Sequence, residues 1–291
     1  PSIASVENDL ISAAKQVHGG DEHVVGTVTS GGTESCMLPV LGARERWRRS
    51  TGRTHDRPKM ILPVTAHPAF RKAAHIFDVE VAPVRVGYAM GSGDRVPEGL
   101  RRLGVEVEIM DDAMLTTGDL SLFDTIVVGI RASQARPAFV ASNQRLLDFA
   151  EAGGTLIVQY QQPDFIAQGL APFPASMDGN VRVVDETAPI TMLEPGHSVW
   201  TFPNRIGETD FDGWVQERNN YNFTSVDTSR YVPLTEAHDP GEPESRGAML
   251  YAPIGDGHYV YTAYSWFRQL PAGTPGAYRI LANLISLSAT E

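Results

Sequence analysis

From residue 84 to residue 160 the chain alternates short β-branched runs with helical stretches, and this alternation constrains the fold more than any other feature. The runs cover residues 84–89, 105–110, 124–130 and 155–160. Helices are predicted between them, one opened by Pro97 and one over residues 139–152. Continuous apolar strands separated by helices are typical of a parallel sheet with helices on both faces. We therefore predict an α/β fold.

Beyond the fourth run the pattern becomes irregular. Residues 161–245 are rich in Pro, Asn, Asp and Gly, which predicts loops with short antiparallel strands. Two further runs, 248–252 and 258–264, flank the turn Gly255-Asp256-Gly257 and predict a hairpin. A closing helix is predicted over residues 276–287.

The first 83 residues differ from the rest in charge. They carry ten Lys and Arg against nine Asp and Glu, whereas the other 208 residues carry fourteen against twenty-six. All three lysines (Lys15, Lys59 and Lys72) and the only cysteine, Cys36, lie in this first part. Because a change of composition often marks a domain boundary, we predict two domains, residues 1–83 and 84–291.

Residues 1–83 have the pattern of an incomplete α/β unit. Helical spacing is present over residues 6–17, 33–49 and 69–77, and strands are predicted over residues 24–29, 60–64 and 79–81. A complete doubly wound unit would continue beyond the last strand, but a new pattern begins there.

The segment 26–35, GTVTSGGTES, carries the clearest functional motif. Its β-branched run leads through Gly31, Gly32 and Thr33 into a helix, so backbone N–H groups and the helix N-terminus would face an anion such as phosphate. An enzyme that holds pyridoxal phosphate in this way also needs a lysine to form the Schiff base. The chain contains no lysine after Lys72.

This motif and the segment 62–81, LPVTAHPAFRKAAHIFDVEV, resemble pyridoxal-phosphate enzymes of the group II decarboxylase class, sphingosine-1-phosphate lyase in particular. The resemblance covers roughly residues 1–82 and implies part of the large domain of a pyridoxal-phosphate transferase fold. It implies that Gly31, Gly32 and Thr33 bind the cofactor phosphate. It also implies that His67 stacks on the pyridine ring.

The segment lacks the two residues that the family needs for catalysis. The family needs an acidic residue at the pyridinium nitrogen and a lysine that carries the cofactor, both well downstream of His67, and neither motif is present. Lys72 lies on the helix beyond His67 rather than facing the cradle. We favour an alternative to stacking on the cofactor, in which His67 is a half-buried histidine that lies between a strand and a helix. We expect no catalytic residue and no bound cofactor in this segment. Binding of pyridoxal phosphate is implied only by the resemblance to that family.

Residues 84–288 resemble a second family. The landmarks are VGYAMGSGDRVPEGLRRLGVEVE, LSLFDTIVVGIRA, LLDFAEAGGTLIVQY, DFDGWVQER and YTAYSWFRQLPAGTPGAYRILANLISL. They resemble the glutamine-amidotransferase-like domain on the C-terminal side of bacterial PIG-L or LmbE-type deacetylases. The resemblance implies a flavodoxin-like, class I amidotransferase-like parallel sheet.

The chemistry of that second family is not retained in this sequence. An amidotransferase nucleophile would stand on the turn after a central strand, where this chain has Tyr160-Gln161-Gln162 and no cysteine or serine. The His-Pro-Asp-Asp motif of the zinc deacetylases is absent. The eight histidines show no ligand-like pairing except His67 and His75, which we interpret as coincidence, so no metal site is predicted.

A binding crevice remains, since ligands of open α/β sheets bind at the carboxyl ends of the strands. The predicted loops there carry Asp94, Arg131, Gln161 and Arg268, our candidates for a ligand pocket. Two arginines and an aspartate would suit a polyol or a sugar acid. The alternative, which we favour, is that the arginines bind a nearby acidic stretch. That stretch holds Asp210, Asp212 and Glu217, and the aromatic candidates for stacking on a sugar are Trp214, Tyr221 and Trp266.

The composition restricts partners and location. The net charge is −11, and an acidic second part with few cations argues against nucleic acid and anionic membranes as partners. No apolar run approaches the length of a membrane span. A single cysteine cannot form an intrachain disulfide, which suits a reducing compartment, so we expect a cytoplasmic protein.

Two functions fit these features. The first is a non-catalytic accessory or binding module with a carbohydrate-related ligand. The alternative is a pyridoxal-phosphate-dependent carbon–carbon lyase or decarboxylase whose lysine comes from another chain. The sequence leaves open the ligand, the oligomeric state (a homo-oligomer is one alternative), whether residues 1–83 fold independently, and whether the fusion is natural or an artefact.

Overall fold

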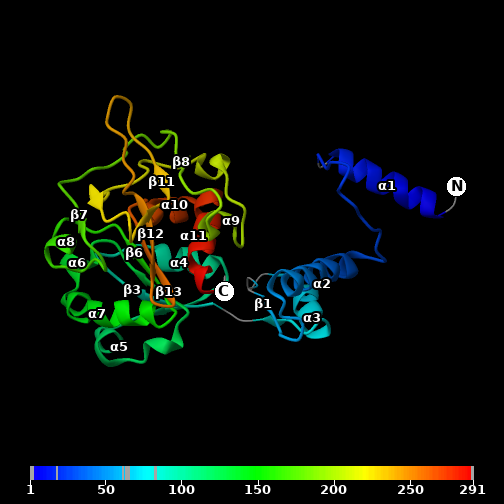
Figure 1. Cartoon of the computed structure of the whole chain (residues 1–291), viewed down its shortest axis with the longest axis horizontal. Helices are drawn as coiled ribbons and strands as arrows, with labels where there is room; N and C mark the ends of the chain where they lie inside the picture. Colours follow the sequence, from blue (N-terminus) through cyan, green and yellow to red (C-terminus); the bar gives the residue numbers. More distant parts are fainter. Residues whose placement is uncertain (1–2, 18, 61, 63–65, 82–83, 290–291) are drawn as a thin grey trace. The chain divides into compact units, whose positions relative to one another are not determined.

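The structure is a computed structural model that describes residues 3–17, 19–60, 62, 66–81 and 84–289 (Figure 1). Its contacts divide the chain into two compact units, Pro1–Ala82 (unit 1) and Pro83–Glu291 (unit 2). Each unit is described by itself below.

Unit 1 consists of helices and two very short strands. The helices are α1 (Ile3–Val17), α2 (Gly32–Thr51) and α3 (Pro68–Ile76), and the strands β1 (Lys59–Met60) and β2 (Glu80–Val81) pair in parallel. All three predicted helices are confirmed. The buried core is small and joins α2, α3 and the residue before β2. It comprises Val40, Ala73, Ala74 and Val79, with Met37, Met60, Phe70 and Phe77 packed against it.

One predicted strand of unit 1 is wrong. Residues 24–29 have no regular secondary structure, and the side chain of Val25 is 88% exposed. A strand requires a neighbour to pair its backbone groups, and no strand of the described residues pairs with this run. The strand predicted over residues 79–81 is confirmed as β2. A third strand was predicted over residues 60–64, but its residues 61, 63 and 64 lie outside the described part of the chain.

Unit 2 is built on a seven-stranded, mostly parallel sheet. Its strands, in spatial order, are β10 (Val232–Pro233), β12 (Met249–Ile254), β13 (Gly257–Thr262), β6 (Thr155–Gln159), β5 (Thr125–Val128), β3 (Arg85–Ala89) and β4 (Glu106–Ile109). The pairs from β13 to β4 are parallel, and β12 and β10 add antiparallel strands at one edge. The predicted α/β class is confirmed, with an antiparallel edge that the prediction of a parallel sheet did not include.

The central strands are buried on both sides. Every residue of β5, β6 and β13 is buried. Because successive side chains of a strand point to opposite faces, this burial means that both faces of the sheet are covered. Contacts with the sheet come from α4 (Val96–Arg102), α7 (Pro137–Glu151) and α11 (Pro275–Ile285). Further helices of this unit are α5 (Asp112–Thr117), α6 (Ala132–Ala135), α8 (Asp164–Ala167) and α10 (Trp266–Ala272), with the turns η1 (Leu120–Leu122) and η3 (Leu287–Ala289).

The irregular region between β6 and β12 contains short elements, as predicted. They are β7 (Ala175–Ser176), β8 (Thr191–Met192), α9 (Ser198–Thr201), η2 (Glu208–Phe211), β9 (Ser225–Val226) and β11 (Thr235–Glu236). The two-residue pairs β7–β9 and β8–β11 are antiparallel. The hairpin β12–β13 turns at Gly255-Asp256, where Ile254 pairs with Gly257. None of the described helices is both long enough and apolar enough to cross a bilayer.

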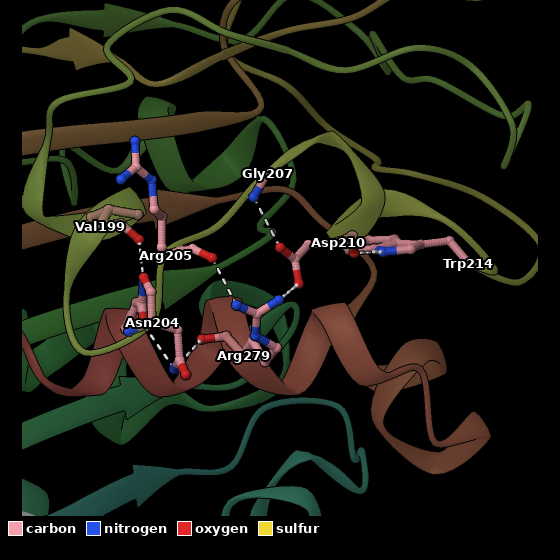
Figure 2. Close-up of polar contacts among 8 residues, drawn as sticks. Val199, Asn204, Arg205, Gly207, Asp210, Trp214 and Arg279 are labelled. Atoms are coloured by element: carbon pink, nitrogen blue, oxygen red, sulfur yellow. Dashed lines mark hydrogen bonds and ion pairs between the residues drawn. The ribbon is translucent and has the colours of Figure 1, made fainter. Parts of the chain in front are cut away.

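A polar cluster fastens the closing helix α11 to this irregular region (Figure 2). The buried carboxylate of Asp210 accepts from Arg279 Nη1 at 2.6 Å and from the Gly207 N–H at 2.9 Å. Arg279 Nη2 also donates to the carbonyl of Arg205 at 2.7 Å. Asn283 on α11 donates to the carbonyls of Val199 and Asn204, both at 2.8 Å. These bonds satisfy backbone groups of a loop that has little regular structure.

Candidate functional site

The loops that follow the parallel strands meet at one edge of the sheet of unit 2. The register pairs Ala89 with Val128, Val128 with Val158, and Gln159 with Thr262, so β3, β5, β6 and β13 end close together. The short helices α6 and α8, which follow β5 and β6, contact each other there (Figure 1). This edge carries all four predicted pocket residues of unit 2.

Asp94 fixes the loop after β3. Its carboxylate accepts from Tyr88 Oη at 2.7 and 2.8 Å and from the Val96 N–H at 2.9 Å. Gln159 Nε2 donates to the same Tyr88 oxygen at 2.7 Å. Burial raises the pKa of Asp94, against the lowering effect of the Tyr88 hydrogen bond. The Asp94 carboxylate is thus hydrogen-bonded to groups of the protein itself.

Gln161 lies inside the protein. Its side chain is fully buried, its Oε1 accepts from the Ser133 N–H at 3.0 Å, and its Nε2 donates to the carbonyls of Gly129 (3.0 Å) and Gln159 (2.8 Å). It therefore ties the turn after β6 to the turn after β5, and a ligand at the surface would not reach it.

Arg131 is exposed at the turn from β5 to α6. Its backbone is left-handed, with φ 54°, a conformation that is uncommon for a residue other than glycine. Its guanidinium donates to Gln134 Oε1 at 3.1 and 3.2 Å. From there the chain of hydrogen bonds continues to Gln162 Oε1 (2.5 Å) and on to Tyr221 Oη (3.0 Å). Within the described part of the chain, Arg131 forms no ion pair with a carboxylate.

Aromatic side chains adjoin this polar chain. Tyr160 stacks on Tyr221 with ring centroids 5.8 Å apart and planes 12° apart, and Phe267 lies 5.7 Å from Tyr160. Burial raises the pKa of Tyr160, Arg131 and Arg268 act to lower it, and Glu217 and Tyr221 act to raise it. The backbone N–H of Arg131 also donates to the Tyr160 carbonyl at 3.0 Å, and Arg268 directly follows Phe267 in the sequence. We call Arg131, Tyr160, Tyr221, Phe267 and Arg268 the aromatic site.

Arg268 has an acidic partner. Its Nε lies 2.9 Å from Glu217 Oε1, its Nη1 donates to Gln216, and its guanidinium lies 4.9 Å from the Phe267 centroid. The favoured alternative, in which arginines bind the acidic stretch, is confirmed for this pair. Asp210 of the same stretch pairs with Arg279 instead.

The aromatic candidates differ in how deeply they are buried. Trp214 and Trp266 are buried in the core, whereas Tyr221 is only half-buried and belongs to the aromatic site. Sequence reasoning missed Gln134 as a member of this surface, and it placed Gln162 and Phe267 in the loops 159–162 and 265–268 without giving either a role. A position next to a predicted strand end does not separate surface residues from buried ones.

The predicted phosphate-binding turn of unit 1 has free space around its glycines, but some of its polar groups already form hydrogen bonds within the protein. Helix α2 begins at Gly32, and a side chain added at Gly31 or Gly32 would meet nothing within 4 Å. Glu34 Oε2 accepts from the Ser30 N–H at 2.7 Å and from Ser30 Oγ at 2.6 Å, and these bonds lower the pKa of Glu34. Thr33 contributes a first-turn N–H, a group that an α-helix leaves without an internal partner.

His67 has a structural role in the described residues. Its Nδ1 accepts from the Ala69 N–H at 3.2 Å and so caps the N-terminus of α3, and its side chain is exposed. No hydrogen bond links it to the cradle in the described part of the chain. The turn at Gly31 and Gly32 thus has room for a phosphate, but the Glu34 carboxylate already accepts from the Ser30 N–H there, and the described residues show no contact for the ring or aldehyde of pyridoxal phosphate. No cluster of three potential metal ligands occurs among the described residues.

Comparisons with known proteins match only part of the chain. No family model matches. Sphingosine-1-phosphate lyase of Dictyostelium discoideum is 36% identical over 86 residues, covering 30% of this chain and 16% of the lyase. The L-tyrosine/L-aspartate decarboxylase of Methanocaldococcus jannaschii is 31% identical over 70 residues, covering 22% of this chain and 18% of that enzyme. The chain thus spans less than a fifth of the length of these curated relatives.

Among solved structures, a ThuA-like protein from Bacteroides uniformis has a TM-score of 0.50 at 11% identity, covering 71% of this chain and 92% of that protein. This likeness concerns the fold alone. The similarity to lyases and decarboxylases supports the resemblance stated for the first segment, and the PIG-L resemblance of the second stays a prediction. Over about 30% of its length, therefore, this chain is similar to sphingosine-1-phosphate lyases.

Proposed function

We propose that unit 2 is a non-catalytic binding domain that takes a small sugar acid at the carboxyl edge of its sheet. The finer fold, a flavodoxin-type amidotransferase-like sheet, and a domain boundary near residue 83 are part of this proposal. The observation that carries it is the stacked pair Tyr160–Tyr221, to which Arg131 is joined through the Tyr160 carbonyl and through the hydrogen bonds of Gln134 and Gln162.

The chemistry of the aromatic site suits such a ligand. Aromatic faces pack against the apolar faces of sugar rings, while amide and guanidinium groups bond to hydroxyls and carboxylates. Glu217 already neutralises Arg268, whereas among the described residues the hydrogen bonds of the Arg131 guanidinium go to the neutral amide of Gln134. Arg131 is therefore the cation available to a carboxylate of the ligand.

The site offers no nucleophile for amidotransferase chemistry. The turn after β6 presents Tyr160, and burial raises the pKa of its hydroxyl, which disfavours the ionised, nucleophilic form. Among the described residues, Ser133 is the hydroxyl nearest in sequence to Arg131, and its backbone N–H is bonded to buried Gln161. The residues thus support binding rather than turnover.

Replacing Arg131 by alanine should weaken binding of galacturonic acid to the full chain by about tenfold or more, since hydrogen bonds to charged groups contribute about 1.5–3 kcal/mol. Isothermal titration calorimetry measures this directly. Galactose, which has the same ring without the carboxylate, is the matched control and should bind both proteins equally. If the unaltered chain binds neither sugar, the proposed ligand class is wrong.

The second candidate function is a lyase in which unit 1 supplies the phosphate cradle and another chain supplies the lysine. It is favoured by the 36% identity to the Dictyostelium lyase and by the open turn at Gly31 and Gly32. Pyridoxal phosphate added to the purified chain should then give a borohydride-reducible absorbance band. Replacing Thr33 by proline, which removes a first-turn N–H, should weaken it. A spectrum identical to that of the free cofactor would eliminate a second copy of this chain as the source of the lysine.

A further inference from the structure

A cavity lies within the irregular region of unit 2, between β6 and β12. Its volume is ≈ 620 Å³, within the range of about 300–1,000 Å³ that is typical of small-molecule sites. Three stretches line it, residues 180–182, 223–226 and 242–247, together with Thr228 and Pro233. We call it the loop cavity. Neither the pocket residues predicted from the sequence nor the residues of the aromatic site line it.

Hydrogen bonds between distant segments hold the backbone around Arg182, which lines the cavity. The carbonyl of Val181 accepts from the Asn222 N–H at 2.8 Å. The carbonyl of Val183 accepts from the Arg218 N–H at 3.0 Å. The residues on both sides of Arg182 are therefore tied to another segment, and the position of its Cα is a stable property of the fold.

The backbone that carries the two lining glutamates is held in the same way. The N–H of Glu242 donates to the Asp239 carbonyl at 3.0 Å. Ser245, which directly follows Glu244, exchanges two backbone hydrogen bonds with Ala237, both at 3.0 Å. The charged residues of the loop cavity therefore lie on backbone that the fold has already positioned, and such positioning lowers the cost of binding a ligand.

Three charges of the lining have no ionic partner in the described part of the chain. Arg182 is exposed and forms one long hydrogen bond, of 3.4 Å, to a backbone carbonyl. Glu242 and Glu244 are exposed, and among the described residues their carboxylates form neither an ion pair nor a hydrogen bond. Arg246, by contrast, is paired with Glu236. One positive and two negative charges thus remain, and they complement a ligand with one anionic and two cationic groups.

The rest of the lining provides a hydrogen-bond donor and apolar surface. Ser245 is 8% exposed, and its Oγ accepts from Asn222 Nδ2 at 2.9 Å. This bond uses a lone pair of the Ser245 hydroxyl, whose hydrogen has no acceptor among the described residues and can be donated to a ligand. Phe223, Val226 and Pro233 supply apolar surface, against which the methylene stem of a charged ligand can pack.

We propose that the loop cavity binds a free basic amino acid, with arginine as the representative ligand. The carboxylate of the ligand pairs with Arg182 and accepts from the Ser245 hydroxyl. Its two cationic groups pair with Glu242 and Glu244, and its methylene chain packs on the apolar lining. The two glutamates would repel a polyanion, and a polyamine would leave Arg182 without a partner. This site is distinct from the one proposed for a sugar acid and does not depend on it.

The test compares arginine with two analogues, each lacking one charge, by isothermal titration calorimetry on the full chain. Citrulline has a neutral urea group in place of the guanidinium, and agmatine lacks the carboxylate. Each analogue should bind about fivefold more weakly than arginine, the upper end of what a partly exposed charge pair contributes.

Two variants assign the contacts. In the double variant Glu242→Gln, Glu244→Gln the preference for arginine over citrulline should disappear. In Arg182→Gln the preference for arginine over agmatine should disappear, while the preference over citrulline persists. Glu208→Gln is the matched control, since Glu208 is an exposed glutamate of the same unit that does not line the cavity, and it should leave both preferences unchanged.

The outcomes also separate this inference from the proposed function. An unaltered chain that does not bind arginine at millimolar concentration would overturn the basic amino-acid site. Equal affinities for arginine and citrulline, or a preference over citrulline that survives in the double variant, would overturn it as well. Galacturonic acid should bind the double variant and the unaltered chain equally, because neither glutamate belongs to the aromatic site.

Discussion

Replacing Gly276 by alanine is expected to destabilise unit 2 by about 3 kcal/mol or more, at or above the upper end of the usual cost of overpacking. A Cβ at this position would lie 1.8 Å from the Asp210 carbonyl oxygen and 2.4 Å from its carbon. Both atoms belong to the backbone, so no side-chain rotation relieves the clash. The helix α11 would have to move away from η2.

That movement would also break the polar cluster of Figure 2. Arg279 and Asn283 both lie on α11, and their bonds to Asp210 and to the Asn204 carbonyl depend on the present spacing. Asp210 is 4% exposed, and a buried carboxylate that loses its partner carries a desolvation cost. Urea unfolding followed by tryptophan fluorescence measures the loss, because Trp200, Trp214 and Trp266 are buried in this unit.

Gly207→Ala is the matched control in the same cluster. Gly207 has an ordinary extended backbone with φ −138°, and an added Cβ would meet nothing within 4 Å. Its N–H, which donates to Asp210, is retained in the variant. We expect a change within about 0.5 kcal/mol. A Gly276→Ala protein as stable as this control would show that α11 and η2 do not approach as closely as described.

Elastase should cut unit 1 after Val24, Val25 or Val28 more than a thousandfold faster than any site in the buried strands of unit 2. Elastase cleaves after small aliphatic residues in extended backbone. Residues 24–28 are without regular structure, and Val25 is 88% exposed, so cleavage needs no prior opening. Cleavage in the core of unit 2 requires unfolding, and about 5 kcal/mol of opening free energy corresponds to a factor above 10³.

Val184 provides the matched comparison inside unit 2. It is 44% exposed, but its N–H and that of Asp185 are held by the carboxylate of Asp239 at 2.8 to 3.0 Å. Asp239→Ala should therefore create a new elastase site after Val184. Gel electrophoresis with mass spectrometry identifies the cuts. Equal resistance of both units would mean that residues 24–28 pair with a partner in solution, and unit 1 would then not be the small, weakly protected body described above.

Much of the fold was predictable because its signals are local. The β-branched runs became β3, β4, β5 and β6, and the helical spacing over residues 33–49 became α2. The failure over residues 24–29 has a physical cause, since the run has the composition of a strand but lacks a neighbour. Strand propensity describes how well side chains fit a sheet, but a strand also needs a neighbouring strand to pair with.

The candidate site was predictable only to the level of the sheet edge. Asp94, Arg131, Gln161 and Arg268 all lie near strand ends, as the alternation implies. Which of them faces a ligand depends on contacts between segments far apart in the chain, such as Gln161 with Gly129 and Arg268 with Glu217. Sequence spacing carries no information about these pairings.

By itself the sequence determined the α/β class, the compositional break near residue 83, the lyase-like motif of the first segment and the lack of a lysine beyond Lys72, because each depends on residue identity or on local periodicity. Only the tertiary structure decided that Gln161 is buried and Arg131 exposed, that Tyr221 stacks on Tyr160, and that a loop cavity lies in the same unit. Burial and side-chain contacts arise from the packing of distant segments, and that packing exists only in the folded chain.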